Sequence, residues 1–225
     1  MTVKELKFFH WMKLYKMKNI LFILLFLSLS NLYCQTREDQ LLERDHKQVI
    51  ERLKFMQYLT NATLKLKWHV EKAGDTLQIP FYTYYKDSIV ADNPVPSSNI
   101  SSYLGYQPNA IPASAGEFIV KVYNRNAATF YNIIDRYGYP TTAKLNKYEK
   151  IDPRQTALII EKASDEWKKI LYPVIQRENR KGNMTELEFM FCKFAFRNGI
   201  IRGYEIEEYL NVLKRNGYKP PIVHQ

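Results

Sequence analysis

Residues 62–70 read ATLKLKWHV, and this stretch decides the fold class that the sequence predicts. The even-numbered residues, from Ala62 to Val70, are apolar, and the odd-numbered residues between them are polar. A period of two residues is typical of a half-buried β-strand. Turn-forming residues follow at 72–75, and residues 76–85 predict a second strand, which Pro80 places at a sheet edge. The stretch therefore predicts a β-hairpin.

The residues on either side of this hairpin predict further elements. Residues 38–59 carry apolar side chains at the spacing of one helix face. Residues 117–123 predict a third strand, with Phe118, Val120 and Val122 on one side. Between the second and third strands, residues 92–116 hold four prolines and little periodicity, which predicts a long connection.

From residue 127 to residue 217 the pattern changes to that of helices. Gly138 stands where a left-handed helix end belongs, and Pro173 is expected to kink or divide the helix that contains it. Helix starts are marked by capping residues at Asp152–Pro153, at Ser164 or Asp165, and at Thr185.

These elements together predict one α+β domain at 35–225. An N-terminal helix comes first, a small antiparallel sheet follows within 62–123, and a C-terminal half of four to five helices occupies 127–217.

The first 34 residues predict a secretory signal peptide. Lys16 and Lys18 precede an apolar run at 20–29, and a small-residue end follows. The run is shorter than the roughly 20 apolar residues that a membrane span requires, so no stable span is expected once the signal is removed. The sixteen residues before Met17 are unusual in front of such a signal, and Met17 is an alternative start.

Cys34 suits the position just before a signal-peptidase cut, which would make Gln35 the new N-terminus. The alternative is a lipoprotein that keeps Cys34 as its lipid-bearing first residue, although Tyr33 is bulky for that signal. The ending Tyr-Cys-Gln resembles secretory signals of the Flavobacterium group, and this Bacteroidetes-like resemblance implies a periplasmic or secreted protein.

The charge of the chain is modestly basic. Removal of residues 1–34, which hold five Lys and one Glu, lowers the net charge from +10 to +6. No block of Lys and Arg exceeds three residues, whereas nucleic-acid grooves show clustered basic residues, so we expect no nucleic-acid partner.

No motif in the sequence points to a cofactor or a metal. The chain has no Gly-rich phosphate loop and no zinc-ligand spacing of Cys and His, so we expect neither a cofactor nor a metal site. Cys192, the one cysteine after residue 34, lies in an apolar run and is expected to be a buried, inert thiol.

The second half of the chain resembles an uncharacterised bacterial family of domains of unknown function. The helix that ends in Gly138-Tyr139-Pro140 matches that family's Gly-Trp/Tyr-Pro motif, and the resemblance covers about 127–199. Glu161-Lys162-Ala163 stands at the place of the family's Gln-His-Ala motif. Phe189 to Lys193 stands at the place of its Tyr-Leu-x-Asp-Arg motif, so Lys162 and Cys192 replace its His and Asp. The resemblance implies a diverged member that binds or scaffolds.

Two main functional hypotheses follow from these patterns. The first is a non-catalytic binding domain for a protein, a peptide or a glycan, because tyrosine is abundant at 17 residues. Its candidate binding residues are Tyr103, Tyr106 and Tyr139. The tyrosines of the long connection are expected either to hold it against the protein or to meet a ligand, and codon usage in an AT-rich genome is a further explanation for the composition.

The second hypothesis is a hydrolase acting on cell-envelope material. Its candidate residues are Asp135, Glu161 and Lys162, with Glu186 or Glu188, because paired carboxylates divide acid and base roles. Glu161 and Asp165 are expected to share a helix face. A secreted toxin or immunity-type protein is a third possibility that no particular residue favours.

Overall fold

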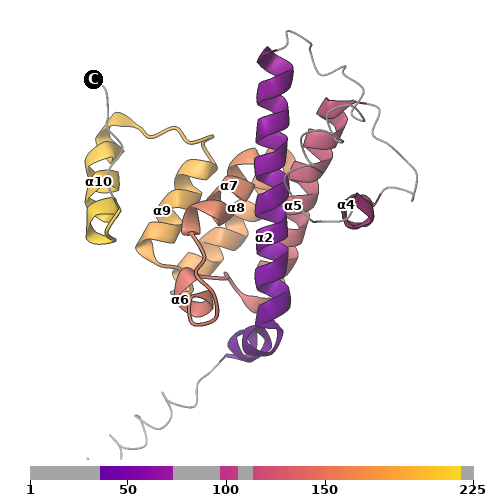
Figure 1. Ribbon diagram of the computed structural model, residues 1–225. Helices are drawn as coiled ribbons and strands as arrows, with labels where there is room; N and C mark the ends of the chain where they lie inside the picture. The colour runs from indigo at the N-terminus through magenta and orange to yellow at the C-terminus, as the bar shows by residue number, and fades with distance from the viewer. Residues whose placement is uncertain (1–35, 73–96, 106–113, 219–225) are drawn as a thin grey trace, which may run out of the picture. The chain divides into compact units, whose positions relative to one another are not determined.

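A computed structural model describes residues 36–72, 97–105 and 114–218 (Figure 1). The chain divides into two units, Met1–Leu41 and Leu42–Gln225, and the packing contacts described below lie within the second. The elements in chain order are α2 (Arg37–Lys72), α4 (Ser97–Leu104), α5 (Ala115–Tyr137), α6 (Thr142–Leu145), α7 (Pro153–Lys162), α8 (Asp165–Arg180), α9 (Glu186–Ala195), the 3₁₀ helix η2 (Gly203–Glu205) and α10 (Ile206–Arg215).

Helix α2 continues without a break through the residues predicted to form the first strand. The buried positions of α2 from residue 56 to residue 68 are Met56, Leu59, Thr60, Ala62, Thr63 and Leu66. Their spacing of three or four residues places them on one side of a helix. Trp68, which the alternation placed with the apolar face, is 55% exposed. The prediction of a strand at 62–70 is therefore wrong.

Two threonines explain why the alternation of apolar and polar residues led to the wrong prediction of a strand. The hydroxyl of Thr60 donates to the carbonyl of Met56 at 2.8 Å, and that of Thr63 donates to the carbonyl of Leu59 at 3.0 Å. A threonine hydroxyl that bonds one turn back on its own helix is satisfied without water, so the side chain can be buried among apolar neighbours. Thr63 therefore belongs to the apolar face, although its residue type counts as polar in the sequence.

Residues 117–123, predicted as a third strand, lie in α5. Ser114 caps this helix, since its side chain accepts a hydrogen bond from the backbone N–H of Glu117 at 3.1 Å. Phe118, Ile119 and Val122 are buried, which is helical spacing, while Val120 is 58% exposed. Over only seven residues, the spacing of one helix face resembles the alternation of a strand, so the prediction of a third strand is wrong.

The α+β prediction is corrected accordingly. In the ranges 36–72, 97–105 and 114–218 the structure has helices and no strand, so the described protein is mainly α-helical. The predicted second strand at 76–85 lies outside the described residues.

The capping residues predicted for the C-terminal half are confirmed, although its first helix, α5, begins at Ala115 and not near residue 127. Asp152 caps α7 with Pro153 in its first turn, Ser164 caps α8, and Gly138 ends α5 with a φ of 69°. Helix α8 is continuous across Pro173, so of the two predicted alternatives, a kink or a division, the division does not occur.

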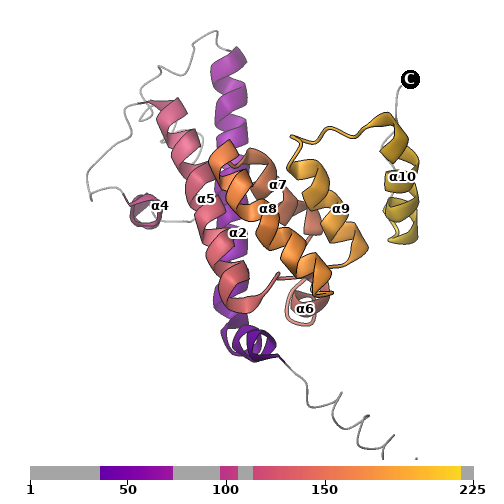
Figure 2. The ribbon, with the colours of Figure 1, turned by 180° about the vertical axis from the view of Figure 1, so that it is seen from behind.

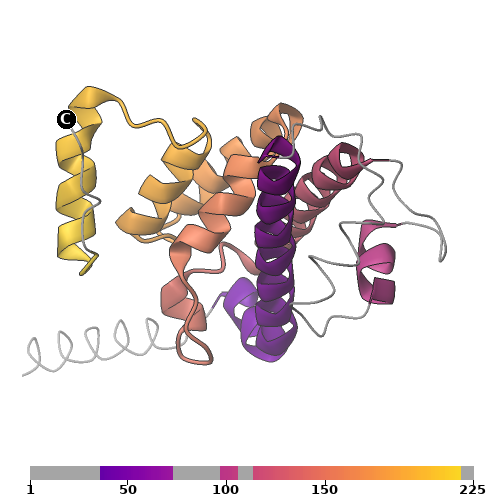
Figure 3. The same ribbon diagram turned by 45° about the horizontal axis from the view of Figure 1, so that its top comes forward.

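A buried polar network joins α2, α4 and α5, which pack around a shared apolar core (Figures 1 and 3). Asn126 of α5 donates to the carbonyl of Met56 at 3.0 Å and to the hydroxyl of Thr60 at 2.9 Å. Its Oδ1 accepts a hydrogen bond from the hydroxyl of Tyr103 at 2.8 Å. Because an unpaired buried amide is costly, this network favours one register between the three helices.

The corner after α5 is held by two buried carboxylates. Glu178 of α8 accepts from the backbone N–H of Tyr139 at 3.3 Å. Glu188 of α9 accepts from the backbone N–H of Thr142 at 2.6 Å and from that residue's hydroxyl at 3.1 Å. The Tyr139 ring contacts Phe130 edge to face, at 6.0 Å between ring centroids. The corner therefore determines where α8 and α9 sit against α5.

Helices α7 and α9 lie side by side, with α8 next to α9 (Figures 1 and 2). Cys192 of α9 is fully buried, which confirms the prediction, and its sulfur lies 3.4 Å from the Tyr139 hydroxyl. Burial raises the pKa of the Cys192 thiol to about 12, so it stays protonated at neutral pH.

Substitution of Thr63 tests the corrected secondary structure. We expect Thr63→Lys to lower the free energy of unfolding by about 3 kcal/mol or more, because it places an unpaired charge in the interface of α2. Urea denaturation followed by circular dichroism measures the effect.

Asn61→Lys is the matched control, because Asn61 is exposed on the same helix. Its effect should stay within about 0.5 kcal/mol. In a strand, residues 61 and 63 would both face the solvent. Equal effects of the two substitutions on the free energy of unfolding would therefore contradict the helix.

Candidate functional site

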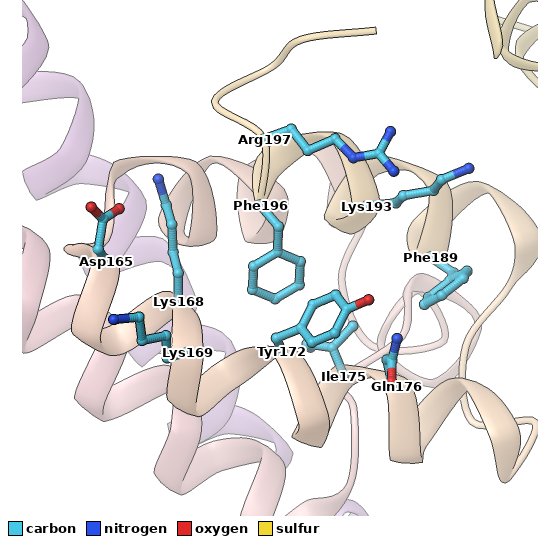
Figure 4. Close-up of a pocket in the computed structure, with 10 residues that line it drawn as sticks. All are labelled: Asp165, Lys168, Lys169, Tyr172, Ile175, Gln176, Phe189, Lys193, Phe196 and Arg197. Atoms are coloured by element: carbon cyan, nitrogen blue, oxygen red, sulfur yellow. The ribbon is translucent and has the colours of Figure 1, made fainter. Parts of the chain in front are cut away.

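The candidate functional site is a groove between α8 and α9, with a volume of about 760 Å³ (Figure 4). This volume lies within the range of known ligand sites. Its lining residues are Asp165, Lys168, Lys169, Tyr172, Ile175, Gln176, Phe189, Lys193, Phe196 and Arg197.

The α8 wall of the groove follows from residue spacing. Lys168, Tyr172 and Gln176 are four residues apart, so they project from one side of the helix. Leu171 and Ile175 are buried, and they anchor α8 to the protein. The result is a row of polar and aromatic side chains above an apolar floor.

The α9 wall is positioned by a capping box. Thr185 accepts from the backbone N–H of Glu188, and Glu188 accepts in return from the backbone N–H of Thr185 at 2.9 Å. From this fixed start, Phe189 and Lys193 face the groove at a spacing of four residues. Leu187, Phe191 and Ala195, on the other side of α9, are buried, so the groove face is turned outward.

Aromatic side chains occupy the centre of the groove. The rings of Tyr172 and Phe196 meet edge to face with centroids 5.2 Å apart, and they lie between the basic side chains in Figure 4. Tyr172 is 49% exposed, while Ile175 beneath it is buried. Exposed aromatic groups over an apolar floor are typical of the central part of a binding interface.

Basic side chains surround this centre. Lys168 and Lys169 extend from α8, and Lys193 and Arg197 come from the α9 side (Figure 4). Asp165 is the one carboxylate among the lining residues. The edge of the groove is therefore predominantly positive.

Glu205 holds the two cations of the α9 side. Its carboxylate lies 2.8 Å from Nζ of Lys193 and accepts two hydrogen bonds from Nη1 of Arg197, at 2.9 and 2.7 Å. Glu205 is 3% exposed. The bonds from Lys193 and Arg197 outweigh the opposing effect of burial and lower the pKa of Glu205 to about 2. One carboxylate thus fixes two cations at the groove edge.

Lys168 is fixed at the other side by a neutral group. Its ammonium donates to Oδ1 of Asn198, just beyond α9, where Asn198 adopts a φ of 57°. This bond links the start of α8 to the chain after α9 without neutralising the charge of Lys168.

The groove has little of what acid–base catalysis requires. Such chemistry needs two titratable groups with different roles close to one another, and Asp165 is the single carboxylate in the lining. Within the described ranges, no group of three or more His, Cys, Asp or Glu side chains is arranged to hold a metal ion.

The predicted tyrosines lie in different places. Tyr139 is 1% exposed, and its hydroxyl is 2.9 Å from that of Thr156, so it has almost no surface to offer a ligand. Tyr103 is partly buried on α4, and its bond to Asn126 favours the interpretation that it holds its segment against the protein. Tyr106 lies outside the described residues.

The residues predicted for a hydrolase likewise lie in different places and make different contacts. Glu161 and Lys162 form an ion pair at 2.7 Å, and Asp135 is exposed on α5. Helix α7 ends at Lys162 and α8 begins at Asp165, so the prediction that Glu161 and Asp165 share a helix face is wrong.

The two remaining glutamates differ in burial. Glu186 is exposed and pairs with Arg215 of α10 at 2.9 Å. Glu188 is buried, and its two oxygens are fully engaged by the corner before α6 and by the capping box. Both therefore act in the packing of helices.

The sequence predictions missed most of the groove residues. The signal for them was present. Phe189, Lys193 and Arg197 recur every four residues, as Lys168, Tyr172 and Gln176 do, and Phe196 follows three residues after Lys193. A search for mixed cationic and aromatic helix faces would have found both walls.

A second hollow of about 670 Å³ lies around the start of α7 and the start of α9. Two of its charged residues pair with each other, since Arg154 forms hydrogen bonds with Asp152, and the Arg154 guanidinium lies 5.4 Å from the centre of the Tyr218 ring. We therefore regard the α8–α9 groove as the stronger candidate.

Comparisons with protein-family models, curated proteins and solved structures found no match for the chain. The resemblance of 127–199 to a domain of unknown function stays a prediction. In the part of the chain that the structure describes, no helix has the length and apolar character needed to cross a membrane.

The pH dependence of Glu205→Gln tests the anchor of the α9 side. The pKa of Glu205 in the folded protein is lowered from its usual value of 4.5 to about 2. Its ion pairs therefore stabilise the folded state above pH 4.5, and this stabilisation is lost as the pH falls towards 2. We expect the wild type to exceed the variant in stability by a constant amount from pH 7 to 4.5, and the difference to shrink below.

Urea titrations at several pH values measure this difference. Glu207→Gln, at an exposed position of α10, is the control and should show no such dependence. A wild-type advantage that persists unchanged at pH 2, or that is absent at pH 7, would contradict the role of Glu205.

Proposed function

We propose that this chain is a non-catalytic binding domain of an exported protein, and that the α8–α9 groove binds a polypeptide segment of a partner. The observation that carries the proposal is the half-exposed Tyr172 ring, held against Phe196 over the buried Ile175. Aromatic side chains held rigidly in this way lose little entropy on binding.

The shape of the groove supports a polypeptide ligand. Asp165 and Gln176 lie near its two ends on α8, about 16 Å apart at 1.5 Å per residue. An extended chain rises about 3.3 Å per residue, so roughly five residues span this length. A helix-lined groove with an apolar floor is also a common mode of peptide recognition.

The distribution of polar groups favours a peptide over a sugar. Recognition of a glycan needs hydrogen-bonding groups close to the stacked ring, because sugar hydroxyls lose water on binding. Here the uncharged amide of Gln176 and the carboxylate of Asp165 lie at the two ends, while the centre is apolar. An apolar centre with a polar edge is the usual anatomy of a protein interface.

Selection of displayed peptides tests the proposal. A random peptide library is selected on the folded protein, and the enriched peptides are measured against Tyr172→Ala by calorimetry. We expect the loss of the exposed ring to weaken them at least about tenfold, the usual effect of a central interface residue.

Val120→Ala is the control, because Val120 is also about half exposed, at 58%, but lies on α5, outside the groove. It should leave the affinities unchanged. If no peptide is enriched, or if the enriched peptides bind Tyr172→Ala as well as the wild type, the proposal is wrong.

Export is the second part of the proposal, and it rests on the leader at 1–34. We expect protein recovered from the native host to be extracellular or periplasmic and to begin at Gln35. N-terminal sequencing and mass spectrometry measure this. A chain that begins at Cys34 with a lipid would select the lipoprotein alternative, and cytosolic protein that still begins at Met1 or Met17 would refute export.

A further inference from the structure

We infer that the segment bound by the α8–α9 groove is acidic, with carboxylate side chains next to an apolar one. This inference rests on the proposed function and specifies its ligand. The charges at the groove edge carry it, together with their position around the aromatic centre (Figure 4).

The apolar part of the ligand is defined by the centre of the groove. Tyr172 and Phe196 present an aromatic edge and face, and Ile175 closes the floor between them. A leucine or phenylalanine side chain inserted there removes apolar surface from water on both partners. This contact holds the segment in place independently of charge.

The acidic part is defined by the cations on both sides. Four basic side chains line the groove, and three carboxylates act on them: Asp165 in the lining, Glu205 beneath Lys193 and Arg197, and Glu166 near Lys169. Two cations share Glu205, and the partner of Lys168 is the neutral amide of Asn198. The cations therefore exceed the carboxylates, and a negative ligand completes the balance.

The position of Asp165 limits where the ligand's carboxylates lie. Asp165 starts α8, one turn before Lys168 and Lys169, so a ligand carboxylate at that end meets a like charge. The favourable positions are those beside Lys168 and Lys169 on one side and beside Lys193 and Arg197 on the other. Acidic residues on both sides of a central apolar residue satisfy this arrangement.

Matched peptides test the inference. The probe is a short peptide that alternates Glu with Leu and Phe, and its partner carries Gln in place of every Glu. Binding is measured by calorimetry at low and high salt, and NMR amide shifts identify the residues contacted. We expect the Glu peptide to bind at least about tenfold more tightly at low salt, with a gap that shrinks as salt rises.

A charge reversal on α8 locates the effect. Lys168→Glu combined with Lys169→Glu should weaken the Glu peptide at least about tenfold and leave the Gln peptide unchanged. Lys47→Glu combined with Lys214→Glu is the matched control, because both lysines are exposed outside the groove and the net charge changes equally. If the α8 variant does not fold, the salt dependence of the wild-type protein decides.

Each outcome separates this inference from the proposed function. Equal binding of the Glu and Gln peptides, with amide shifts at the groove, overturns the acidic ligand and leaves peptide binding intact. Absence of groove shifts with either peptide, together with an empty library selection, overturns both. Groove shifts with an acidic oligosaccharide such as oligogalacturonate, and with neither peptide, overturn the choice of a polypeptide.

Discussion

The buried carboxylate of Glu188 is the interaction on which the C-terminal helices depend. One of its oxygens accepts hydrogen bonds from Thr142 at the start of α6, and the other accepts them from Thr185 at the start of α9. A buried carboxylate is tolerated only when its oxygens are paired, so both helix starts are held in the same place. The groove wall carried by α9 is therefore a consequence of where α5 ends.

Much of the helical half could be predicted from the sequence, and the N-terminal half could not. Capping signals such as Asp152–Pro153 and Thr185 act locally, so their meaning does not depend on the rest of the fold. The buried face of α2 depends on its neighbours. Thr60 and Thr63 are buried with their hydroxyls bonded to the helix backbone, and Thr60 also accepts a hydrogen bond from Asn126 of α5. A count of residue types assigns these threonines to water and produces a strand.

The candidate site was harder to predict than the helices that form it. Tyr139, one of the tyrosines that the sequence suggested as ligand-binding residues, is buried in the corner after α5. Tyr172 carries no comparable signal by itself, because its exposure depends on how α8 packs in the folded protein. The spacing of residues marks each of the two helix faces in the sequence, but only the packing of α8 with α9 shows that they line one groove.

The shared counter-ion at Glu205 gives the C-terminal segment a role that its place in the chain conceals. Neither η2 nor α10 borders the α8–α9 groove, yet η2 supplies the charge that lets Lys193 and Arg197 lie together. A shortened protein that ends before residue 205 would keep every groove-lining residue and still place two like charges in mutual repulsion. The short 3₁₀ helix η2 thus fixes the two cations of a groove that it does not border.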